Sequence, residues 1–258
     1  MEFYSAIAPY YDLLFPFDKG VAAFLSSAMD PSRAAVPGLR SSAVDVSRRA
    51  YLDVGCSTGT LLSAFSDRFD KLVGIDLDPE LLKLAAKKML PGERKKVELL
   101  EEDARALPQL FPEEEFSLVT CLGNTLPHLT GPGEVGKFLS TVRDLLERDG
   151  VFVFQTINYD RVLDGGLRGL PTIERGEVSF ERYYSALRDD GLIDFDTIFT
   201  DPENEIEEKY SFPLVPIRRK QIEECIVQAG FSWYRLFGGF DGSSLTGESF
   251  LMVGVCER

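Results

Sequence analysis

The chain contains few of the residues that metal sites and disulfide frameworks need. It has one histidine and four cysteines, and no two cysteines form a CxxC pair. A cysteine/histidine zinc site is therefore not expected, and a disulfide framework has no local spacing to support it. No metal site is predicted.

Long hydrophobic runs are missing as well. No stretch of 18 apolar residues occurs, so neither a transmembrane helix nor a membrane partner is predicted. The opening residues, MEFYSAIAPYYD, are acidic and aromatic and lack the basic region of a signal peptide. Together with the scattered cysteines, these features predict a reduced, cytoplasmic protein.

Positive charge is scarce. Lysine and arginine together number 28 against 42 aspartates and glutamates, which gives a formal net charge of -14. Such an average surface repels a polyanion, so no nucleic-acid partner is expected. The most basic stretches, RRK at 218–220 and ERKK at 93–96, are interpreted as solvated faces of helices or loops.

Hydrophobic residues make up 44% of the 258-residue chain, enough for one large domain or one domain with an insertion. Between residues 50 and 158, short apolar stretches alternate with segments of helical spacing. Near-continuous apolar strands separated by helices predict a parallel sheet covered on both faces, and hence an α/β fold. The predicted strands are AYLDV, KLVGID, VELLEED, FSLVTCL and VFVFQTIN.

Two regions interrupt this alternation. Residues 1–49 are predicted to be an N-terminal helical segment followed by a connector, and residues 50–169 the Rossmann-like core, whose cofactor-binding motifs are described below. Residues 170–217 alternate with period two and contain turn signals, which predicts an antiparallel insertion of three strands. Residues 218–258 are expected to complete the core with a last helix and two strands.

The stretch YLDVGCSTGT, residues 51–60, predicts a strand that runs into a glycine turn. A dinucleotide site needs the pattern GxGxxG there, but Ser57 and Thr60 replace two of the glycines. Asp53, just before Gly55, would repel phosphate and suits a cationic or zwitterionic ligand. Asp76 ends the next predicted strand, where a carboxylate accepts hydrogen bonds from ribose hydroxyls. S-adenosylmethionine combines a ribose with an ammonium group and a sulfonium, and it carries no phosphate.

Four motifs over residues 50–158 resemble those of class I S-adenosylmethionine-dependent methyltransferases, in that family's order and spacing. They are LDVGCSTG, VGIDLD, EEDARAL and FSLVTCLGNTLPHL. The resemblance implies S-adenosyl-L-methionine as cofactor and a Rossmann-like, seven-stranded, mostly parallel sheet with helices on both faces and an antiparallel last strand. In the third motif it places Asp103 at the adenine amino group. The predicted cofactor-binding residues are Tyr4, Asp53, Gly55, Cys56, Ser57, Gly59, Asp76, Leu77, Asp103, Ala104, Cys121 and Leu122.

Three further stretches are similar to glycine and amino-sugar N-methyltransferases: CLGNTLPHL, INYD at 157–160, and the N-terminal FYSAIAPYYDLLF. The likeness implies N-methylation of a small amine or amino acid, with Asn158 contacting the substrate and the N-terminal segment closing over the cofactor. The insertion matches no motif of that group, so its substrate-contacting residues cannot be transferred.

His128 and Tyr11 are the candidate catalytic residues. His128 or a tyrosine could take the proton of an amine acceptor, and an aromatic face near the sulfonium would stabilise its charge. His128 is equally compatible with a buried ring of structural role. The candidate substrate-binding residues are Asn124, Asn158, Arg182 and Tyr184.

The insertion is predicted to be a lid over the carboxyl edge of the sheet. Its stretch VSFERYYSAL places Phe180, Arg182 and Tyr184 on one face of a strand. Left exposed, this face would be an apolar patch prone to association, so it is expected to pack against another part of the protein. Arg182 would then be free to hold a substrate carboxylate by a bidentate contact. The alternative is an ion pair between Arg182 and one of the chain's many carboxylates.

Two other functions stay open at this point. One is an O- or C-methyltransferase acting on a phenol or quinone, and the other is a non-catalytic, cofactor-binding subunit. Neither the acceptor nor the oligomeric state follows from the sequence, and a homodimer is one possibility.

Overall fold

A computed structural model describes residues 2–29 and 49–258, so most of the predicted connector lies outside the described residues. The N-terminal segment is helical, as predicted. It consists of α1 (Glu2–Ile7), the 3-10 turn η1 (Ala8–Tyr10), α2 (Tyr11–Leu14) and α3 (Lys19–Ala28). Asp18 caps α3 by accepting a hydrogen bond from the backbone of Gly20.

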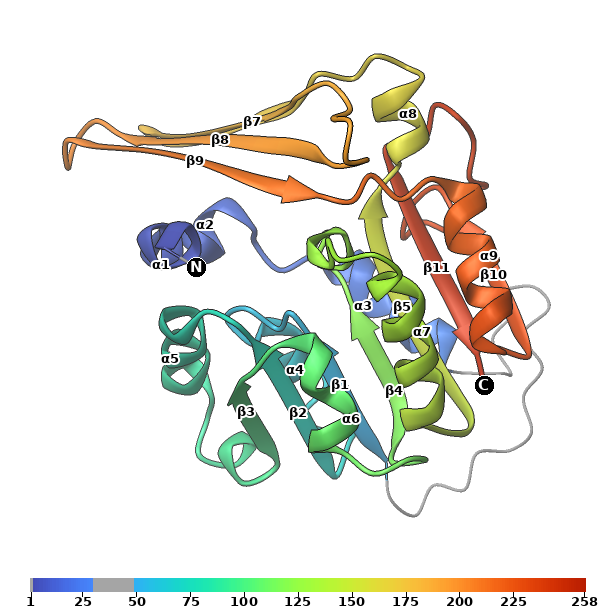
Figure 1. The fold of residues 1–258 in the computed structure, drawn as a ribbon. Coiled ribbons are helices and arrows are strands. Elements are labelled where there is room, and N and C mark those ends of the chain that lie inside the picture. The colour runs from blue at the N-terminus through green and yellow to red at the C-terminus, as the bar shows by residue number, and fades with distance from the viewer. Residues whose placement is uncertain (1, 30–48) are drawn as a thin grey trace.

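A seven-stranded sheet in the order β10-β11-β5-β4-β1-β2-β3 forms the centre of the molecule (Figure 1). β11 runs antiparallel to both of its neighbours, whereas the pairs formed by β1 to β5 are all parallel. This arrangement confirms the predicted Rossmann-like sheet with an antiparallel last strand. The strands are β1 (Ala50–Val54), β2 (Lys71–Asp76), β3 (Val97–Glu101), β4 (Phe116–Cys121), β5 (Leu146–Ile157), β10 (Trp233–Phe237) and β11 (Leu251–Glu257).

Helices cover both faces of the sheet, because each helix buries one apolar stripe against it. One core cluster joins the sheet to α7 and α9, and the other joins it to α3, α4 and α5. Pro79 starts α5, and the side chain of Asp78 caps it by accepting from two backbone N–H groups; an aspartate followed by a proline is a helix-start signal that the sequence alone carries. The remaining helical elements are α4 (Thr60–Ala64), α5 (Pro79–Lys88), η2 (Glu93–Lys95), η3 (Ala104–Ala106), α6 (Leu107–Leu110), η4 (Leu126–His128), α7 (Glu134–Leu145), α8 (Tyr159–Leu163) and α9 (Arg219–Ala229). None of the described helices is long and apolar enough to cross a membrane.

The insertion is a second sheet of four antiparallel strands, so the prediction of three strands is wrong. Its order is β6 (Gly169–Arg175), β7 (Val178–Tyr184), β8 (Ile193–Asp201) and β9 (Ile206–Leu214). The missed strand, β6, lies at an edge and is largely exposed, so its sequence carries no alternation. Pro171 falls where the pairing register shifts, which is typical of proline in edge strands. We call this four-stranded sheet the lid sheet.

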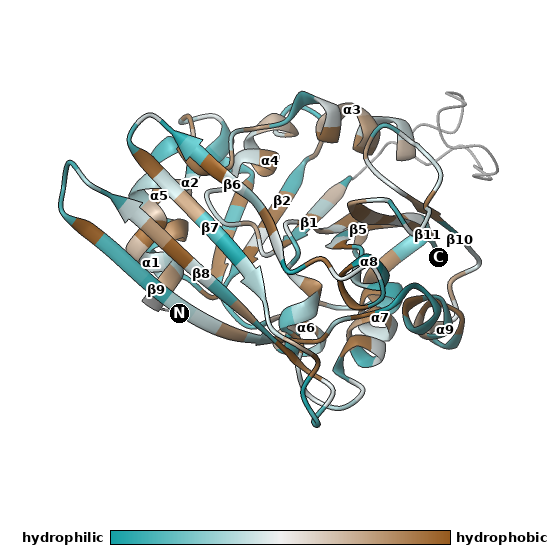
Figure 2. Cartoon of the chain, turned by 90° about the horizontal axis from the view of Figure 1, so that it is seen from above, coloured by the Kyte–Doolittle hydropathy of each residue, from teal (hydrophilic) through white to brown (hydrophobic). Residues whose placement is uncertain are grey.

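The lid sheet lies on the side of the central sheet where the parallel strands end (Figure 1). Its apolar face does not pack directly over the cavity of the core. Phe180 and Phe199, on the distal half of the lid sheet, contact Phe3 and Leu14 of the N-terminal helices. The helices α1 and α2 therefore lie between the lid sheet and the core, and the view from above shows the strands crossing over them (Figure 2).

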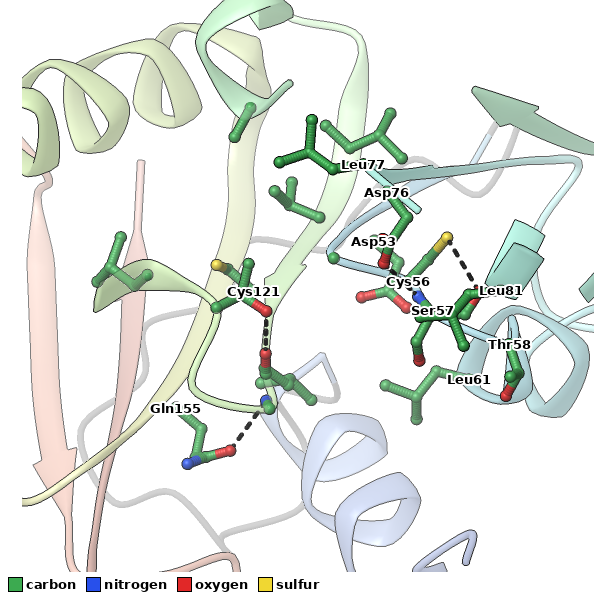
Figure 3. A pocket seen from close by; sticks show the side chains of 18 of the residues that line it. Asp53, Cys56, Ser57, Thr58, Leu61, Asp76, Leu77, Leu81, Cys121 and Gln155 are labelled. Carbon is green, nitrogen blue, oxygen red and sulfur yellow. Dashed lines mark hydrogen bonds between the residues drawn. The ribbon is translucent and has the colours of Figure 1, made fainter. Parts of the chain in front are cut away.

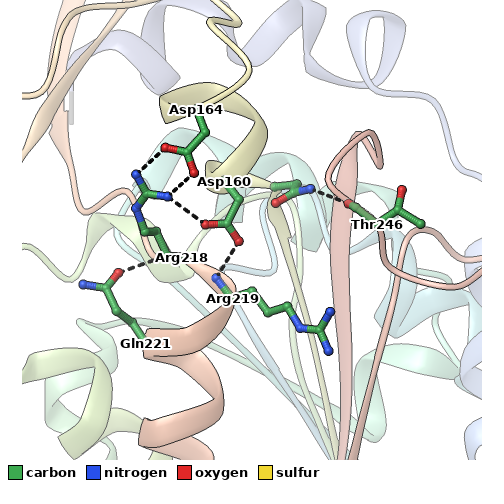
Figure 4. A network of polar contacts seen from close by, with 7 residues as sticks. Asp160, Asp164, Arg218, Arg219, Gln221 and Thr246 are labelled. Atoms are coloured by element: carbon green, nitrogen blue, oxygen red, sulfur yellow. Dashed lines mark hydrogen bonds and ion pairs between the residues drawn. The ribbon is translucent and has the colours of Figure 1, made fainter.

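The root of the lid sheet is anchored on the core. Tyr184 and Leu214 pack with Ile157 and Tyr159, where β5 passes into α8. Close by, two chain segments connect the lid sheet to the core, one before β6 and one after β9. Arg218, on the second segment, joins them by pairing with Asp160 of α8 and with Asp164, which follows α8 (Figure 4). The RRK stretch, interpreted as a solvated face, thus contributes one arginine to a structural network.

Candidate functional site

A cavity of about 320 Å³ opens at the carboxyl ends of β1, β2 and β4, where ligands bind in open α/β sheets. The N-terminal helices form its roof, because Tyr4, Tyr11 and Phe15 line it from above. Figure 3 shows Asp53 and Asp76 on one wall and Cys121 and Gln155 on the opposite one. Of the predicted site residues, thirteen line this cavity: Tyr4, Tyr11, Asp53, Gly55, Cys56, Ser57, Asp76, Leu77, Asp103, Ala104, Cys121, Leu122 and His128.

The glycine turn has two separate steric requirements. Gly55 has φ +77°, and a Cβ atom there would lie 2.5 Å from the hydroxyl of Thr125. Any larger residue would therefore push Thr125 into the cavity. Gly59 has φ +68° and lies against Ala85 of α5, outside the cavity lining. The missing side chain of Gly59 lets α5 pack closely against the glycine turn. The predicted contact of Gly59 with a cofactor stays a prediction.

The two acidic residues on the cavity wall have different surroundings. Asp76 accepts hydrogen bonds from the backbone N–H groups of Ser57 (2.8 Å) and Asp78 (3.0 Å), and burial raises its pKa. Each of its oxygens keeps a lone pair for a ligand hydroxyl. Asp53 is only 3% exposed, and burial raises its pKa to about 7. Its partner is the hydroxyl of Thr120 at 2.6 Å, and within the described ranges it forms no ion pair.

The rim of the cavity carries the third motif. Asp103 caps the short turn η3 by accepting from the backbone of Arg105 and also pairs with that side chain at 2.7 Å. Arg105 in turn pairs with Glu134 at 2.8 Å. The position agrees with contact to an amino group, which Asp103 can make with its remaining lone pairs. Leu77 is 42% exposed at the mouth of the cavity, where its side chain offers an apolar surface for a flat ring.

Hydrogen bonds, together with an ion pair between Asp12 and Lys88 of α5, hold the N-terminal helices over the cavity. Ser5 donates to Asp78 at 2.7 Å, and Thr58 of the glycine turn donates to Asp12 at 2.6 Å. Tyr10 donates to Asp201 of the lid sheet at 2.6 Å. The segment therefore contacts the core and the lid sheet at once, which agrees with the expected closure over a cofactor.

His128, at the end of η4, lies at the aromatic end of the cavity. Its ring centroid is 6.4 Å from that of Tyr4 and 6.2 Å from that of Phe212. Burial lowers the pKa of His128 to about 4, so the imidazole is neutral at physiological pH. Burial also raises the pKa of Tyr11 to about 12, which keeps its phenol protonated. The two candidate catalytic residues thus present neutral groups.

Four predicted substrate residues do not line the described cavity. Asn124 accepts from the backbone of Ile157 and donates to Tyr159. Asn158 is buried and uses its amide to hold the carbonyls of Thr246 and Ser249. Tyr184 packs its ring 5.1 Å from that of Phe195. Arg182, the fourth, lies on the inner face of the lid sheet.

A polar row crosses this inner face between its two apolar clusters. Arg182 pairs in register with Thr197, and Thr197 pairs with Tyr210 of β9. Arg182 donates to the carbonyl of Pro171 and stacks over the ring of Phe180 at 5.3 Å. Its Nε atom is buried without a hydrogen-bond partner, and no carboxylate within residues 2–29 and 49–258 pairs with it. The alternative of a structural ion pair is therefore not observed in that part of the chain.

Several cavity residues escaped the sequence analysis. Gln155 of β5 accepts from the backbone of Gly123 at 3.0 Å and lines the cavity. Phe15 and Phe17 line it from the N-terminal side, and only the aromatic character of that segment indicated them. Thr120 reaches the site through Asp53. Nothing in the sequence marks Gln155 or Thr120, because both lie inside apolar strands.

The residues present fit S-adenosylmethionine. A buried carboxyl without a protein cation suits an ammonium group, and a second carboxyl at the end of β2 suits a ribose. Gly55 lines the cavity, and its missing side chain leaves room for Thr125, which lines the cavity as well. A metal is not indicated, since no group of three histidine, cysteine or acidic residues in the described ranges is arranged to hold one.

Comparison with known proteins agrees with this geometry. Residues 52–150 match the family described as methyltransferase domain. The chain is 29% identical over 130 residues to a glycine/sarcosine N-methyltransferase of Aphanothece halophytica, a match that covers 50% of this chain and 46% of the relative. It is 26% identical over 201 residues to a dTDP-3-amino-3,6-dideoxy-alpha-D-glucopyranose N,N-dimethyltransferase of Streptomyces fradiae, covering 76% and 75% of the two chains.

Among solved structures, an S-adenosylmethionine-dependent methyltransferase from Clostridium acetobutylicum has the same fold. Its TM-score is 0.72 at 18% identity, with 98% of both chains covered. The first relative is matched over less than half of its own length, and the family match covers the part of the chain that carries the four motifs. Residues 52–150, which carry the four motifs and much of the cavity lining, therefore match a methyltransferase domain, and the whole chain has the fold of the solved methyltransferase.

Proposed function

We propose that the protein transfers a methyl group from S-adenosylmethionine to the nitrogen of a small amine or amino acid. The observation that carries the proposal is the cavity itself. It holds two carboxyls suited to the cofactor at one end and, at the other, the neutral rings of Tyr4 and His128, behind which Phe212 packs. The similarity to the glycine and amino-sugar enzymes supports nitrogen as the acceptor atom.

Binding of the cofactor would use the residues already described. Asp76 would accept from the ribose hydroxyls, Asp53 would face the ammonium group, and Asp103 would accept from the adenine amino group. When bound, the cofactor supplies an electrophilic methyl group on a sulfonium. The protein's task is to align the acceptor against it, and proximity of this kind is worth about 7–11 kcal/mol.

The acceptor nitrogen must lose its proton before it can react. His128, with a pKa of about 4, is a weak base at neutral pH, and Tyr11 is protonated. Both suit hydrogen bonding to the acceptor better than removal of a proton from an ammonium. We infer that the reactive amine forms by loss of the proton to water, and that the site selects the neutral form because burial disfavours a charge there.

Arg182 supports a carboxylate-bearing acceptor. The unpartnered Nε lies on the inner face of the lid sheet, beside the row that includes Thr197 and Tyr210. The guanidinium is half-buried, and its buried Nε without a hydrogen-bond partner is costly unless a ligand completes its contacts. An amino acid would bring the missing carboxylate together with the amine.

The test is methyl transfer from labelled cofactor to a panel of amino acids, simple amines, amino sugars and phenols. We expect label in the product only when an amine is present, and fastest transfer with an amino acid. Transfer to phenols alone would contradict N-methylation and favour the O-methylating alternative. Tight cofactor binding without transfer to any acceptor would favour the non-catalytic alternative.

Replacement of Arg182 tests the substrate class. Arg182→Ala should raise KM for the preferred amino acid by about 10- to 100-fold, because it removes a charge-assisted contact, and should leave cofactor affinity unchanged. Arg175→Ala, at an exposed end of the lid sheet, is the matched control and should behave like the wild type. An unchanged KM in the folded Arg182 variant would rule out the assignment.

A further inference from the structure

Three side chains form a buried hydrogen-bonded chain beneath the cavity floor. Asp53 on β1 stands in register with Thr120 on β4, and Tyr51 points to the same face of the sheet two residues earlier. The Thr120 hydroxyl donates to Oδ1 of Asp53 at 2.6 Å, and the Tyr51 hydroxyl lies 2.8 Å from that of Thr120. Tyr51 and Thr120 are fully buried.

The direction of these hydrogen bonds follows from the donor count. The Thr120 hydroxyl has one proton, and it uses this proton in the hydrogen bond that Asp53 accepts. The Tyr51 hydroxyl must then donate to the oxygen of Thr120. Two successive donors thus point toward Asp53, an arrangement that favours its charged form. The protein supplies this support for a carboxylate, yet no described cation pairs with it.

Asp53 and Asp76 are the two carboxyls of the cavity wall whose pKa burial raises, and Asp76 differs in accepting two backbone N–H hydrogen bonds that favour its charged form. The titratable groups around Asp53 are Asp76 and Cys121 from the neighbouring strands, Cys56 from the turn, Tyr4 and Tyr11 from the roof, and His128, Glu102, Asp103 and Arg105 from the rim. Burial raises the pKa of the thiols and phenols far above neutrality, and His128 titrates at about 4. Arg105 is held by Asp103 and Glu134.

We propose that Tyr51 and Thr120 are positioning residues of the cofactor site, which hold Asp53 as the acceptor for the ammonium group of the cofactor's methionine portion. Below neutral pH, where Asp53 carries a proton in the empty protein, binding of that cation drives the proton from the carboxyl to solvent. The inference rests on the proposed use of S-adenosylmethionine. It adds two residues that touch no ligand, and a proton released on binding.

Titration calorimetry with S-adenosylhomocysteine in two buffers of different ionisation enthalpy measures that proton. Since Asp53 has a pKa of about 7, release should approach one proton at pH 6 and fall toward zero at pH 8. Binding without proton release at pH 6 would overturn the proposal while leaving the cofactor assignment intact. Absence of any binding would overturn both.

Thr120→Val removes the donor to Asp53 and keeps the shape of the side chain. We expect it to weaken S-adenosylhomocysteine binding about tenfold or more, as loss of a hydrogen bond to a charged group does. Binding of methylthioadenosine, which has the adenosine part but no ammonium group, should stay within about twofold. Thr120→Ser keeps the hydroxyl and should restore the wild-type values. Equal losses for both ligands would show damage to packing and refute the positioning role.

Tyr51→Phe should also weaken binding of S-adenosylhomocysteine but not of methylthioadenosine. The loss of affinity should be smaller than for Thr120→Val, because Tyr51 acts through Thr120. Ser117→Ala is the matched control, because that hydroxyl also lies on β4 but donates to the carbonyl of Ala50 outside the cavity. If the Thr120 variants do not fold, carboxyl NMR of the wild type decides the question. The Asp53 signal should titrate near pH 7 in the empty protein and stay ionised at that pH with S-adenosylhomocysteine bound; identical titration in both states would refute the proposal.

Discussion

Burial of the Asp53 carboxyl destabilises the folded protein when the carboxyl is charged, and a bound cation would offset this penalty. The pKa of this carboxyl is 3.8 ordinarily and about 7 when buried, so between these values the folded chain retains a proton that the unfolded chain loses. The stability linked to this proton is fully present below pH 3.8 and is lost as the pH rises toward 7.

Asp53→Asn should therefore stabilise the empty protein at pH 8. We expect a gain of about 1–3 kcal/mol in the free energy of unfolding, less at pH 5, because the amide avoids the buried charge but adds an N–H group to satisfy. Denaturant unfolding at the two pH values measures it. The same variant should bind S-adenosylhomocysteine more weakly. A variant less stable at pH 8 than the wild type would contradict the buried-charge explanation.

Asp76→Asn tests the ribose contact. The amide keeps one acceptor oxygen for the backbone of Ser57 or Asp78, but hydrogen bonds to a charged oxygen are lost. The loss should be about 1.5–3 kcal/mol, which corresponds to a roughly 10- to 150-fold higher dissociation constant for S-adenosylhomocysteine. Asp67→Asn, on the exposed segment after α4, is the control. Unchanged affinity in a folded variant would remove Asp76 from the site.

The sequence predicted the residues whose role depends on the local backbone. The turn at Gly55, the cap at Asp78 and the acid at the end of β2 follow from neighbouring residues alone. Thr120 and Gln155 could not be found in this way. Their role appears only when register places β4 beside β1 and turns a polar side chain of β5 toward Gly123.

Among the secondary-structure elements, the N-terminal helices contact both the lid sheet and the core. Tyr10 joins them to the lid sheet through Asp201 and packs 4.8 Å from the ring of Phe199. Tyr10→Phe keeps the packing and removes the hydrogen bond, a loss of about 1 kcal/mol. Backbone hydrogen exchange at residues 3–14 should become about fivefold faster, and cofactor dissociation should speed up with it.

Tyr183→Phe provides the comparison for Tyr10, because its hydroxyl bonds to Glu181 in an exposed part of the lid sheet. It should leave exchange at residues 3–14 unchanged. Equal exchange in the wild type and the Tyr10 variant would show that the hydrogen bond to Asp201 does not hold the N-terminal helices in place.

Arg218 holds together the two chain segments that connect the lid sheet to the core. Its two bonds to Asp164 and one to Asp160 tie the end of the lid to the segment that leads into it (Figure 4). Arg218→Ala should loosen the lid root and raise KM for the acceptor several-fold, while cofactor affinity stays within about twofold. Arg219→Ala, which loses only an exposed pair with Glu223, should leave both constants unchanged. A change confined to cofactor affinity would contradict this account.

The lid sheet also shows what period-two patterns cannot reveal. The alternation of VSFERYY correctly placed Phe180, Arg182 and Tyr184 on one face, since register fixes which side chains point together. It could not show what covers that face. The α1 and α2 helices fill the space above the core, and Tyr4 of α1 stacks on Phe212 of the lid sheet.

The whole molecule combines a strongly negative surface with a cavity that holds several carboxyls. A net charge of -14 and the acids at the ends of β1 and β2 both oppose a pyrophosphate. NAD at 100 μM should therefore leave the thermal midpoint of the protein unchanged. A clear upward shift would contradict the way the glycine turn and Asp53 have been interpreted.

Titration calorimetry with S-adenosylhomocysteine on the wild-type protein at pH 7.5 is the most direct test of the central claim, that this cavity is a S-adenosylmethionine site. The cavity and its two carboxyls predict one ligand per chain, a dissociation constant in the micromolar range and a negative heat-capacity change from burial of the adenosine and the apolar rim. A folded protein that gives no binding heat across several temperatures, and no competition by S-adenosylmethionine in a thermal-shift assay, would contradict the account.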